Sequence, residues 1–188
     1  MKTVAIIQGR MSSRRLPGKI LEDIAGMPLL AHVIRRAKAA GVFDEVIVAT
    51  SVEQSDDPVQ DFCKKTGVSC FRGNLNDVLD RYYQAAKFHG ADRIARLTGD
   101  CPLLDPAVIR RVVDALDSQY DYVSNVLHRS FPKGLDTEVF SIQTLTRAWE
   151  QARLPSEREH VTPFIYKNPT LFRIGEVTQK PDHSALRW

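Results

Sequence analysis

The sequence predicts an α/β sandwich with a largely parallel central sheet. Short apolar runs, typical of buried strands, alternate with segments of helical periodicity, and glycine, proline and aspartate stand at the boundaries between them. Of the 188 residues, 43% are hydrophobic and 26% are charged, which is ordinary globular composition and excludes a disordered or collagen-like chain. At roughly 150 residues per domain, this length predicts one domain, residues 1–188.

The first half of the chain contains three predicted strands, each followed by a predicted helix. The strands are residues 3–8, 45–49 and 68–71. Pro28 suits the first turn of a helix that runs to about residue 40, and Gly41 ends it. The next helix begins at Asp57 and ends at Gly67, and a third runs to residue 88 with Asn76 as its cap.

The second half begins with the same alternation and then changes. We expect a strand over 93–98, a helix from Asp105 to about residue 118 and strands over 121–125 and 136–140. A helix over 141–153, a capping box formed by Ser156 and Glu159 before another helix, and a strand over 172–177 complete the pattern. In such sheets ligands bind beyond the carboxyl ends of the strands, so the loops there are the candidates for function.

Charge and hydropathy exclude several function classes. The net charge is +3, from 26 basic and 23 acidic residues, which gives no strong field for nucleic acid or a membrane surface. The apolar run Val4–Ile7 is far shorter than the roughly 18 residues of a membrane span, and it also lacks the length of the apolar region of a secretory signal. The three cysteines (Cys63, Cys70 and Cys101) form no CxxC pair and indicate reduced thiols. We therefore expect a cytoplasmic protein without nucleic-acid or membrane partners.

A cationic loop, residues 8–19, follows the first predicted strand. It carries two glycines, two serines and four cations: Gly9, Gly18, Ser12, Ser13, Arg10, Arg14, Arg15 and Lys19. These groups suit a polyphosphate. The loop is not a Walker A motif, because Ser13 replaces the first glycine and Ile20 follows Lys19. The alternative is a solvated basic surface loop, but the position directly after a buried strand favours a phosphate site.

A carboxylate stands at the end of another strand. Thr98 and Gly99 let the chain turn after the strand over 93–98 and leave Asp100 at the carboxyl edge of the sheet. An aspartate facing a polyphosphate loop is well placed to hold Mg²⁺. The alternative is that Asp100 caps a turn.

Two further motifs carry polar side chains. Asp136 and Glu138 alternate, which places both carboxylates on one face of a strand, where they would meet a metal, acceptor hydroxyls, a neighbouring arginine or solvent. Glu159 is explained by the predicted capping box, and His160 beside it is a candidate ligand contact, although a lone histidine is more often structural.

These motifs occur in one order that resembles a known family. They are 8–21, 49–51 with 56–58, 72–73 with 77–82, 96–105, 134–138 and 158–163. Together they resemble the cytidylyltransferases typified by spore coat polysaccharide biosynthesis protein F, which are related to acylneuraminate and 3-deoxy-manno-octulosonate cytidylyltransferases. The resemblance covers essentially the whole chain.

The resemblance implies a fold, a reaction and a set of site residues. The fold is a Rossmann-like nucleotidyltransferase (GT-A-like) fold, with a mostly parallel central sheet and helices on both faces. The reaction joins CTP to a sugar, a nonulosonic-type keto acid for a surface polysaccharide, and releases pyrophosphate. Arg10, Lys19 and Asp100 would be catalytic, with Mg²⁺ on Asp100. The nucleotide would contact Gly9, Arg10, Ser13, Arg15, Lys19, Arg72, Asp77 and Thr98, and the acceptor would contact Asp136, Glu138 and His160.

The resemblance also implies features of the whole protein. Relatives continue past a segment like 186–188 into a strand with a second metal-binding aspartate, so we expect this chain to be truncated. Residues 127–166 would form an acceptor or dimerisation lobe, and a homodimer is possible. The alternatives are a different nucleotide, a glycosyltransferase activity, or a catalytically silent nucleotide- or sugar-binding module.

Overall fold

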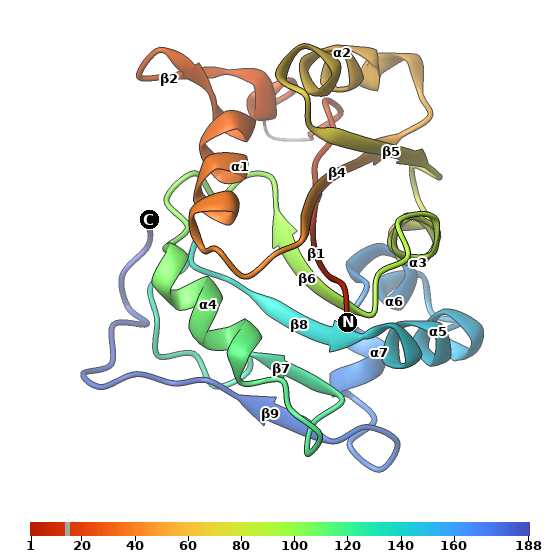
Figure 1. The fold of residues 1–188 in the computed structure, drawn as a ribbon, viewed down its shortest axis with the longest axis vertical. Coiled ribbons are helices and arrows are strands. Elements are labelled where there is room, and N and C mark those ends of the chain that lie inside the picture. Colours follow the sequence, from red (N-terminus) through yellow and green to blue (C-terminus); the bar gives the residue numbers. More distant parts are fainter. Residues whose placement is uncertain (14–15) are drawn as a thin grey trace.

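The computed structural model describes residues 1–13 and 16–188 and is built around a seven-stranded sheet (Figure 1). The strand order is β5-β4-β1-β6-β8-β7-β9, and β8 runs antiparallel to both of its neighbours while the other pairings are parallel. The strands are β1 Thr3–Gln8, β4 Glu45–Ser51, β5 Ser69–Gly73, β6 Arg93–Thr98, β7 Tyr122–Ser124, β8 Glu138–Ser141 and β9 Ile174–Glu176. A small separate hairpin joins β2 Asp23–Ile24 to β3 Met27–Pro28. The predicted mostly parallel sheet is confirmed.

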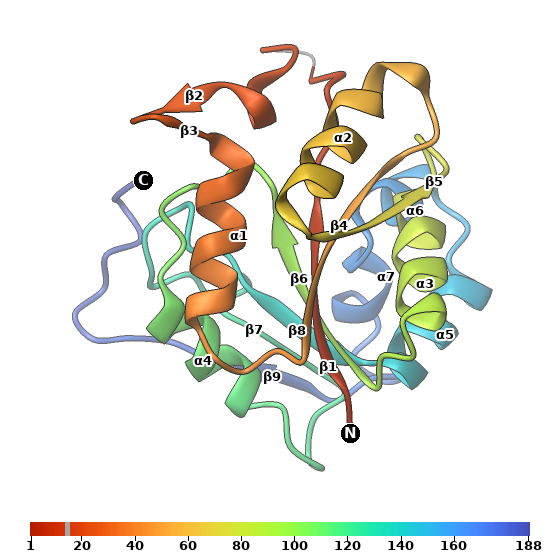
Figure 2. The same cartoon turned by 45° about the horizontal axis from the view of Figure 1, so that its top comes forward.

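The central strands are apolar on both faces because helices cover both. In β1, Ala5 and Ile7 pack into one core, whereas Val4 and Ile6 pack into the other. The first core holds α1 Leu29–Ala39, α2 Asp57–Thr66 and α4 Pro106–Asp114 against the sheet. The second holds α3 Val78–Phe88, α5 Ile142–Gln151 and α7 Pro163–Tyr166, and α6 Pro155–His160 packs on α3 (Figure 2). Two short 3-10 helices, η1 Lys19–Leu21 and η2 Gln54–Asp56, lie in loops beyond strand ends.

Several helix boundaries differ from the sequence prediction; α5, for example, spans Ile142–Gln151 instead of 141–153. The cap of α3 is Asp77 rather than Asn76, because the Asn74 side chain accepts the amides of Asn76 and Asp77 and keeps those residues in a turn. Pro155 begins α6, so the third helical residue is Glu157, and this carboxylate rather than that of Glu159 accepts the amide of Leu154. The helix α4 ends at Asp114 instead of about residue 118.

The carboxyl ends of the parallel strands meet at one edge of the sheet. The antiparallel β8 begins at this edge, so Glu138, its first residue, lies near the last residues of β6 and β7. None of the helices in the described part of the chain has the length and apolar character that a bilayer span requires.

At this edge β1 and β6 approach each other closely. The Gly99 amide donates to the Gln8 carbonyl oxygen at 2.7 Å, and a Cβ at position 99 would stand 2.7 Å from that same oxygen. We therefore predict that Gly99→Ala lowers the free energy of unfolding by about 1–3 kcal/mol, because backbone on both sides must move. Urea denaturation measures this loss.

Gly9→Ala is the matched control. Its new Cβ would meet the end of the Ile20 side chain at 3.1 Å, and a flexible side chain gives way more cheaply than backbone. The loss should stay below about 1 kcal/mol. Equal losses in the two variants would show that the approach of the two strands imposes no special constraint at Gly99.

Candidate active site

Three pockets lie side by side along the carboxyl edge of the parallel strands. The outer pocket, about 550 Å³, is lined by Arg10, Ser12, residues 74–77, Pro155, Arg158 and Glu159. The central pocket, about 380 Å³, is lined by residues 8–10, Ser13, Lys19, Ile20 and residues 98–100. The lobe pocket, about 380 Å³, is lined by Arg96, Thr98, residues 126–127, Arg129, Asp136, Glu138, His160, residues 162–163 and Tyr166. Arg10 lines the first two and Thr98 the last two, so neighbouring pockets adjoin, and we refer to the three together as the cleft.

The central pocket brings together the two sequence motifs predicted to carry the chemistry. The Lys19 ammonium donates to the Asp100 carboxylate at 2.5 Å, across 81 positions of sequence. Gly9, Arg10 and Ser13 line the same space, and Arg15 lies outside the described residues. Burial raises the pKa of the Asp100 carboxyl, but the hydrogen bond and charge of Lys19 outweigh it, so this pKa lies below its usual value. Asp100 is therefore ionised near neutral pH.

The donor set of the central pocket fits a magnesium ion shared with phosphates. Mg²⁺ usually takes one or two carboxylates, and substrate phosphates and waters supply the remaining oxygens. Among residues 1–13 and 16–188 there is no group of three side chains that could hold a metal ion by themselves. Among the described residues that line the pocket, Asp100 supplies one carboxylate, which is enough for a magnesium ion that also binds substrate phosphates and water.

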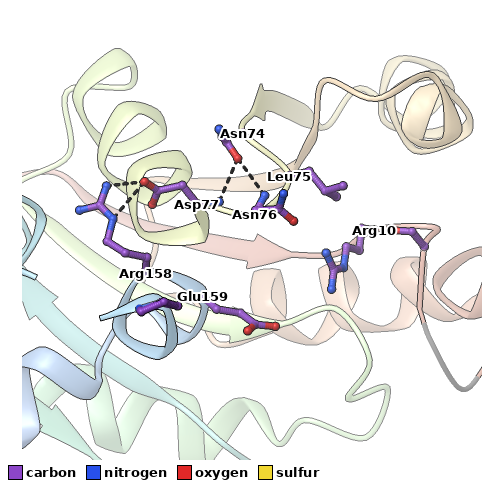
Figure 3. A pocket seen from close by; sticks show the side chains of 9 residues that line it. Arg10, Asn74, Leu75, Asn76, Asp77, Arg158 and Glu159 are labelled. Atoms are coloured by element: carbon purple, nitrogen blue, oxygen red, sulfur yellow. Dashed lines mark hydrogen bonds and ion pairs between the residues drawn. The ribbon is translucent and has the colours of Figure 1, made fainter. Parts of the chain in front are cut away.

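The outer pocket is assembled from three separate parts of the chain (Figure 3). Arg10 comes from the loop after β1, residues 74–77 connect β5 to α3, and Arg158 comes from α6. The Asp77 carboxylate is already engaged, because one oxygen accepts the amide of Asp80 at 2.9 Å and the other accepts the Arg158 guanidinium at 2.5 and 3.0 Å. Asp77 thus anchors the loop against α6 at the wall of the pocket.

Arg72 faces a different set of groups. Its guanidinium donates to the carbonyl oxygens of Ser51 and Glu53, each at 2.8 Å, and pairs with the Asp57 carboxylate at 2.7 Å. Arg72 is not among the described residues that line the three pockets. The guanidinium ties β5 to the loop that precedes α2.

The lobe pocket contains the three residues expected to contact an acceptor. Asp136 and Glu138 both line it, although β8 begins at Glu138 and Asp136 therefore precedes the strand that the sequence predicts over 136–140, and His160 lines it from α6. The sequence left open whether these carboxylates meet a metal, acceptor hydroxyls, an arginine or solvent. In the structure each of them pairs with an arginine. The Arg129 guanidinium donates to both Asp136 oxygens, at 2.6 and 3.0 Å, and Arg96 pairs with Glu138 across β6 and β8.

The ion pair between Glu138 and Arg96 is buried, and Tyr122 adds a hydrogen bond to it. Glu138 is 5% exposed, and its second oxygen accepts the Tyr122 hydroxyl at 2.7 Å. Burial, reinforced by the charge of Glu138, raises the pKa of Tyr122 well above its usual value, so this phenol stays protonated and donates. Burial lowers the pKa of Arg96, but Glu138 outweighs it and raises the pKa above the ordinary value.

Sequence reasoning missed several residues of the cleft. Arg158 stood inside a quoted motif but was given no role, and it closes the outer pocket onto Asp77. Arg129 and Tyr166 lie within the predicted acceptor lobe, 127–166, but outside the motifs, and they line the lobe pocket. Arg158 lies in α6 and not at the end of a strand, so charge at strand ends does not indicate it, and nothing local to Arg129 indicates that it reaches Asp136.

The buried Glu138 pair gives a stability prediction. Glu138→Gln removes the negative charge that compensates the buried Arg96 guanidinium, and breaking a buried pair from one side is strongly destabilising. The free energy of unfolding should fall by about 3–5 kcal/mol in a denaturant titration.

Asp136→Asn is the control for this prediction. The Asp136 side chain is 34% exposed and its partner Arg129 is 25% exposed, so solvent screens the pair. The loss should be about 1 kcal/mol or less. A smaller loss for Glu138→Gln than for Asp136→Asn would contradict the interpretation of Glu138 as a structural carboxylate.

Comparisons with known proteins agree with this architecture. The family model described as cytidylyltransferase matches residues 4–185. Spore coat polysaccharide biosynthesis protein SpsF of Bacillus subtilis is 34% identical over 177 residues, which cover 90% of this chain and 72% of that protein. The structure of a cytidylyltransferase from Leptospira borgpetersenii superposes with a TM-score of 0.95 at 38% identity, covering 100% of this chain and 80% of that one.

A more distant structure shows the same fold. The CMP:2-keto-3-deoxy-manno-octonic acid synthetase complexed with CTP superposes with a TM-score of 0.72 at 21% identity, over 95% of this chain and 91% of that one. The predicted nucleotidyltransferase fold is therefore confirmed. Since the family model covers nearly the whole sequence, this chain belongs to the cytidylyltransferase family and is a nucleotidyltransferase.

Proposed function

We propose that this enzyme transfers the CMP group of CTP to a hydroxyl of a sugar and releases pyrophosphate. The observation that carries the proposal is the order of the three pockets. The central pocket is lined by Arg10, Lys19 and Asp100, and it adjoins the outer pocket at Arg10 and the lobe pocket at Thr98. This order matches a nucleotide that reaches from one side and an acceptor that reaches from the other, with the reacting phosphates between them.

The outer and central pockets suit the two parts of a nucleoside triphosphate. Phosphates in the central pocket would meet two cations, Arg10 and Lys19, beside Gly9 and Ser13 on the pocket wall. We place Arg15 in the same role on the strength of the family resemblance. The nucleoside would then lie in the outer pocket against residues 74–77, whose Leu75 supplies an apolar contact and whose Asn76 supplies an amide. Arg72 would act indirectly, by holding β5 at the start of this loop.

The lobe pocket suits the acceptor. It shares Thr98 with the central pocket, so an acceptor hydroxyl in it can approach the α-phosphorus of a nucleotide bound next door. Asp136 and Glu138 would hold Arg129 and Arg96 toward the acceptor, and His160 would contact it directly from α6. From the family resemblance we propose that the acceptor is a nonulosonic-type keto acid, destined for a surface polysaccharide.

The chemistry requires positioning and charge neutralisation more than a nucleophilic side chain. The acceptor hydroxyl oxygen bonds to the α-phosphorus and gives up its proton to solvent, and the bond from that phosphorus to the pyrophosphate oxygen breaks. Lys19 and Arg10 neutralise the negative charge that builds up on the phosphates. Mg²⁺, held by Asp100 together with phosphate oxygens, would supply further neutralisation. The Asp100 carboxylate also holds the Lys19 ammonium in place before substrate binds.

A nucleotide panel tests the proposal directly. The purified chain is mixed with a set of keto-acid sugars and with CTP, UTP, ATP or GTP in turn, and pyrophosphate release is recorded. We expect release with CTP in the presence of a sugar. Release that is larger with another nucleotide, or that does not need a sugar, would contradict the proposed reaction.

The two cations of the central pocket give the first activity prediction. Lys19→Ala and Arg10→Ala should each lower kcat at least ~10²-fold, because each removes a charge aimed at the reacting phosphates. Arg35→Ala is the control, since Arg35 lies exposed on α1 and should be nearly silent. Retention of more than about half of the wild-type rate by either folded cleft variant would rule out this phosphate assignment.

The Asp100 carboxylate of the central pocket gives the second activity prediction. Asp100→Asn keeps the size of the side chain but removes its charge, so activity should fall sharply and recover in part at raised Mg²⁺ concentration. The melting temperature should shift by a few degrees at most, because Asp100 is partly exposed. A large loss of stability with an unchanged magnesium dependence would assign Asp100 to the turn instead of the metal.

A further inference from the structure

A buried carboxylate, Asp56, lies behind the wall of the cleft and is not used by the proposed chemistry. Its side chain is 0% exposed. One carboxylate oxygen accepts the backbone amide of Met11 at 2.7 Å. The other accepts the backbone amide of Ser51 at 3.0 Å and also the Ser51 hydroxyl. Asp56 therefore connects the end of β4 to the loop after β1, across 45 positions of sequence.

This carboxylate is ionised in the folded protein. Burial raises the pKa of the Asp56 carboxyl, but the Ser51 hydroxyl and the amides of Met11 and Ser51 outweigh burial, so the pKa lies below its usual value. In the described part of the chain its hydrogen bonds come from these neutral donors and no ion pair reaches it. Burying a charged carboxylate is costly, so Asp56 stays ionised only while these hydrogen-bond donors remain in place.

The usual role of an aspartate in this position does not apply. Asp56 precedes the first residue of α2, where an aspartate commonly caps the helix, yet its side chain makes no capping hydrogen bond to α2. The carboxylate turns away from the helix and toward Met11 and Ser51.

Asp56 binds the amide of Met11, and the carbonyl group of Met11 in turn joins the two ends of the cationic loop by hydrogen bonds. The Met11 carbonyl oxygen accepts the amides of Ser13 at 2.9 Å and of Gly18 at 2.8 Å. Gly18 directly precedes Lys19, and Arg10 directly precedes Met11. One residue thus connects both cations of the central pocket, and Asp56 fixes that residue to the sheet.

We propose that Asp56 is a positioning residue that sets the placement of Arg10 and Lys19 for the phosphates of the substrate. This inference rests on the proposed function. The inference concerns the phosphate part of the ligand, because residues 74–77, which line the outer pocket, donate no hydrogen bond to Asp56. Loss of the Asp56 charge should therefore weaken the binding of phosphates while leaving the nucleoside contacts in place.

The test compares Asp56→Asn with the wild type. Asparagine offers one acceptor oxygen, and its NH2 group would face one of two amide donors, so one of the two backbone contacts is lost. The dissociation constants of inorganic pyrophosphate and of cytidine are measured by calorimetry and by competition against CTP, well below the melting temperature of each variant. We expect the dissociation constant of pyrophosphate to rise at least 10-fold and that of cytidine to change less than 2-fold.

Asp121→Asn is the matched control. Asp121 also accepts a backbone amide, that of Arg173 at 2.8 Å, but it precedes β7 at the opposite edge of the sheet from the cleft. This variant should lose stability and keep both dissociation constants. If Asp56→Asn does not fold, Asp56→Ser, which leaves a smaller hydroxyl in the same place, is compared in the same way.

The outcomes separate the inference from the proposed function. Equal weakening of pyrophosphate and cytidine binding by the Asp56 variant, or no weakening of either, would overturn the positioning role while wild-type activity with CTP still stands. A wild-type chain that binds neither pyrophosphate nor CTP would overturn the proposed function, and the inference with it. A selective loss of pyrophosphate affinity supports both.

Discussion

The close approach of β1 and β6 at their carboxyl ends is the constraint on which the site depends. These two parallel strands are paired in register along their whole length, and the Gly99 amide closes onto the Gln8 carbonyl oxygen at 2.7 Å. The cationic loop begins where β1 ends, and Asp100 lies just after the end of β6, next to it. Parallel pairing therefore forces two segments about 80 positions apart to share one space, and the ion pair between Lys19 and Asp100 follows from it.

Charged side chains then fix the walls around that space. Asp56 holds the loop after β1 from behind, and the Arg158 pair with Asp77 holds the loop after β5 against α6. Glu138 and Arg96 join β8 to β6 beneath the lobe pocket. Each of these contacts joins elements that are distant in sequence, so the cleft is positioned by the sheet and by its own charged side chains together. The antiparallel β8 matters here because its first residue, instead of its last, lies at the functional edge.

The sequence predicts the elements better than the contacts between them. The strand over residues 3–8 and the strand over 93–98 are confirmed to the residue, because a short segment rich in apolar residues between turn residues leaves little choice of boundary. The predicted capping residue of α3 is wrong by one position, because Asn74 forms a turn that no local sequence pattern indicates. The motifs indicate Lys19 and Asp100 together, but they give no sign that Asp77 is held by Arg158 or that Arg72 donates to backbone carbonyls. Such pairings depend on tertiary geometry, which one sequence does not encode locally.

The central claim is that the phosphates of CTP occupy the central pocket, between a nucleoside in the outer pocket and an acceptor in the lobe pocket. A crystal structure of the chain with α,β-methylene-CTP and magnesium tests this most directly, since the analogue cannot release pyrophosphate. The account predicts phosphate oxygens within hydrogen-bond distance of Lys19 and Arg10, with the metal on Asp100 and the base against residues 74–77. A triphosphate bound away from Lys19, or a base seated in the lobe pocket, would contradict it.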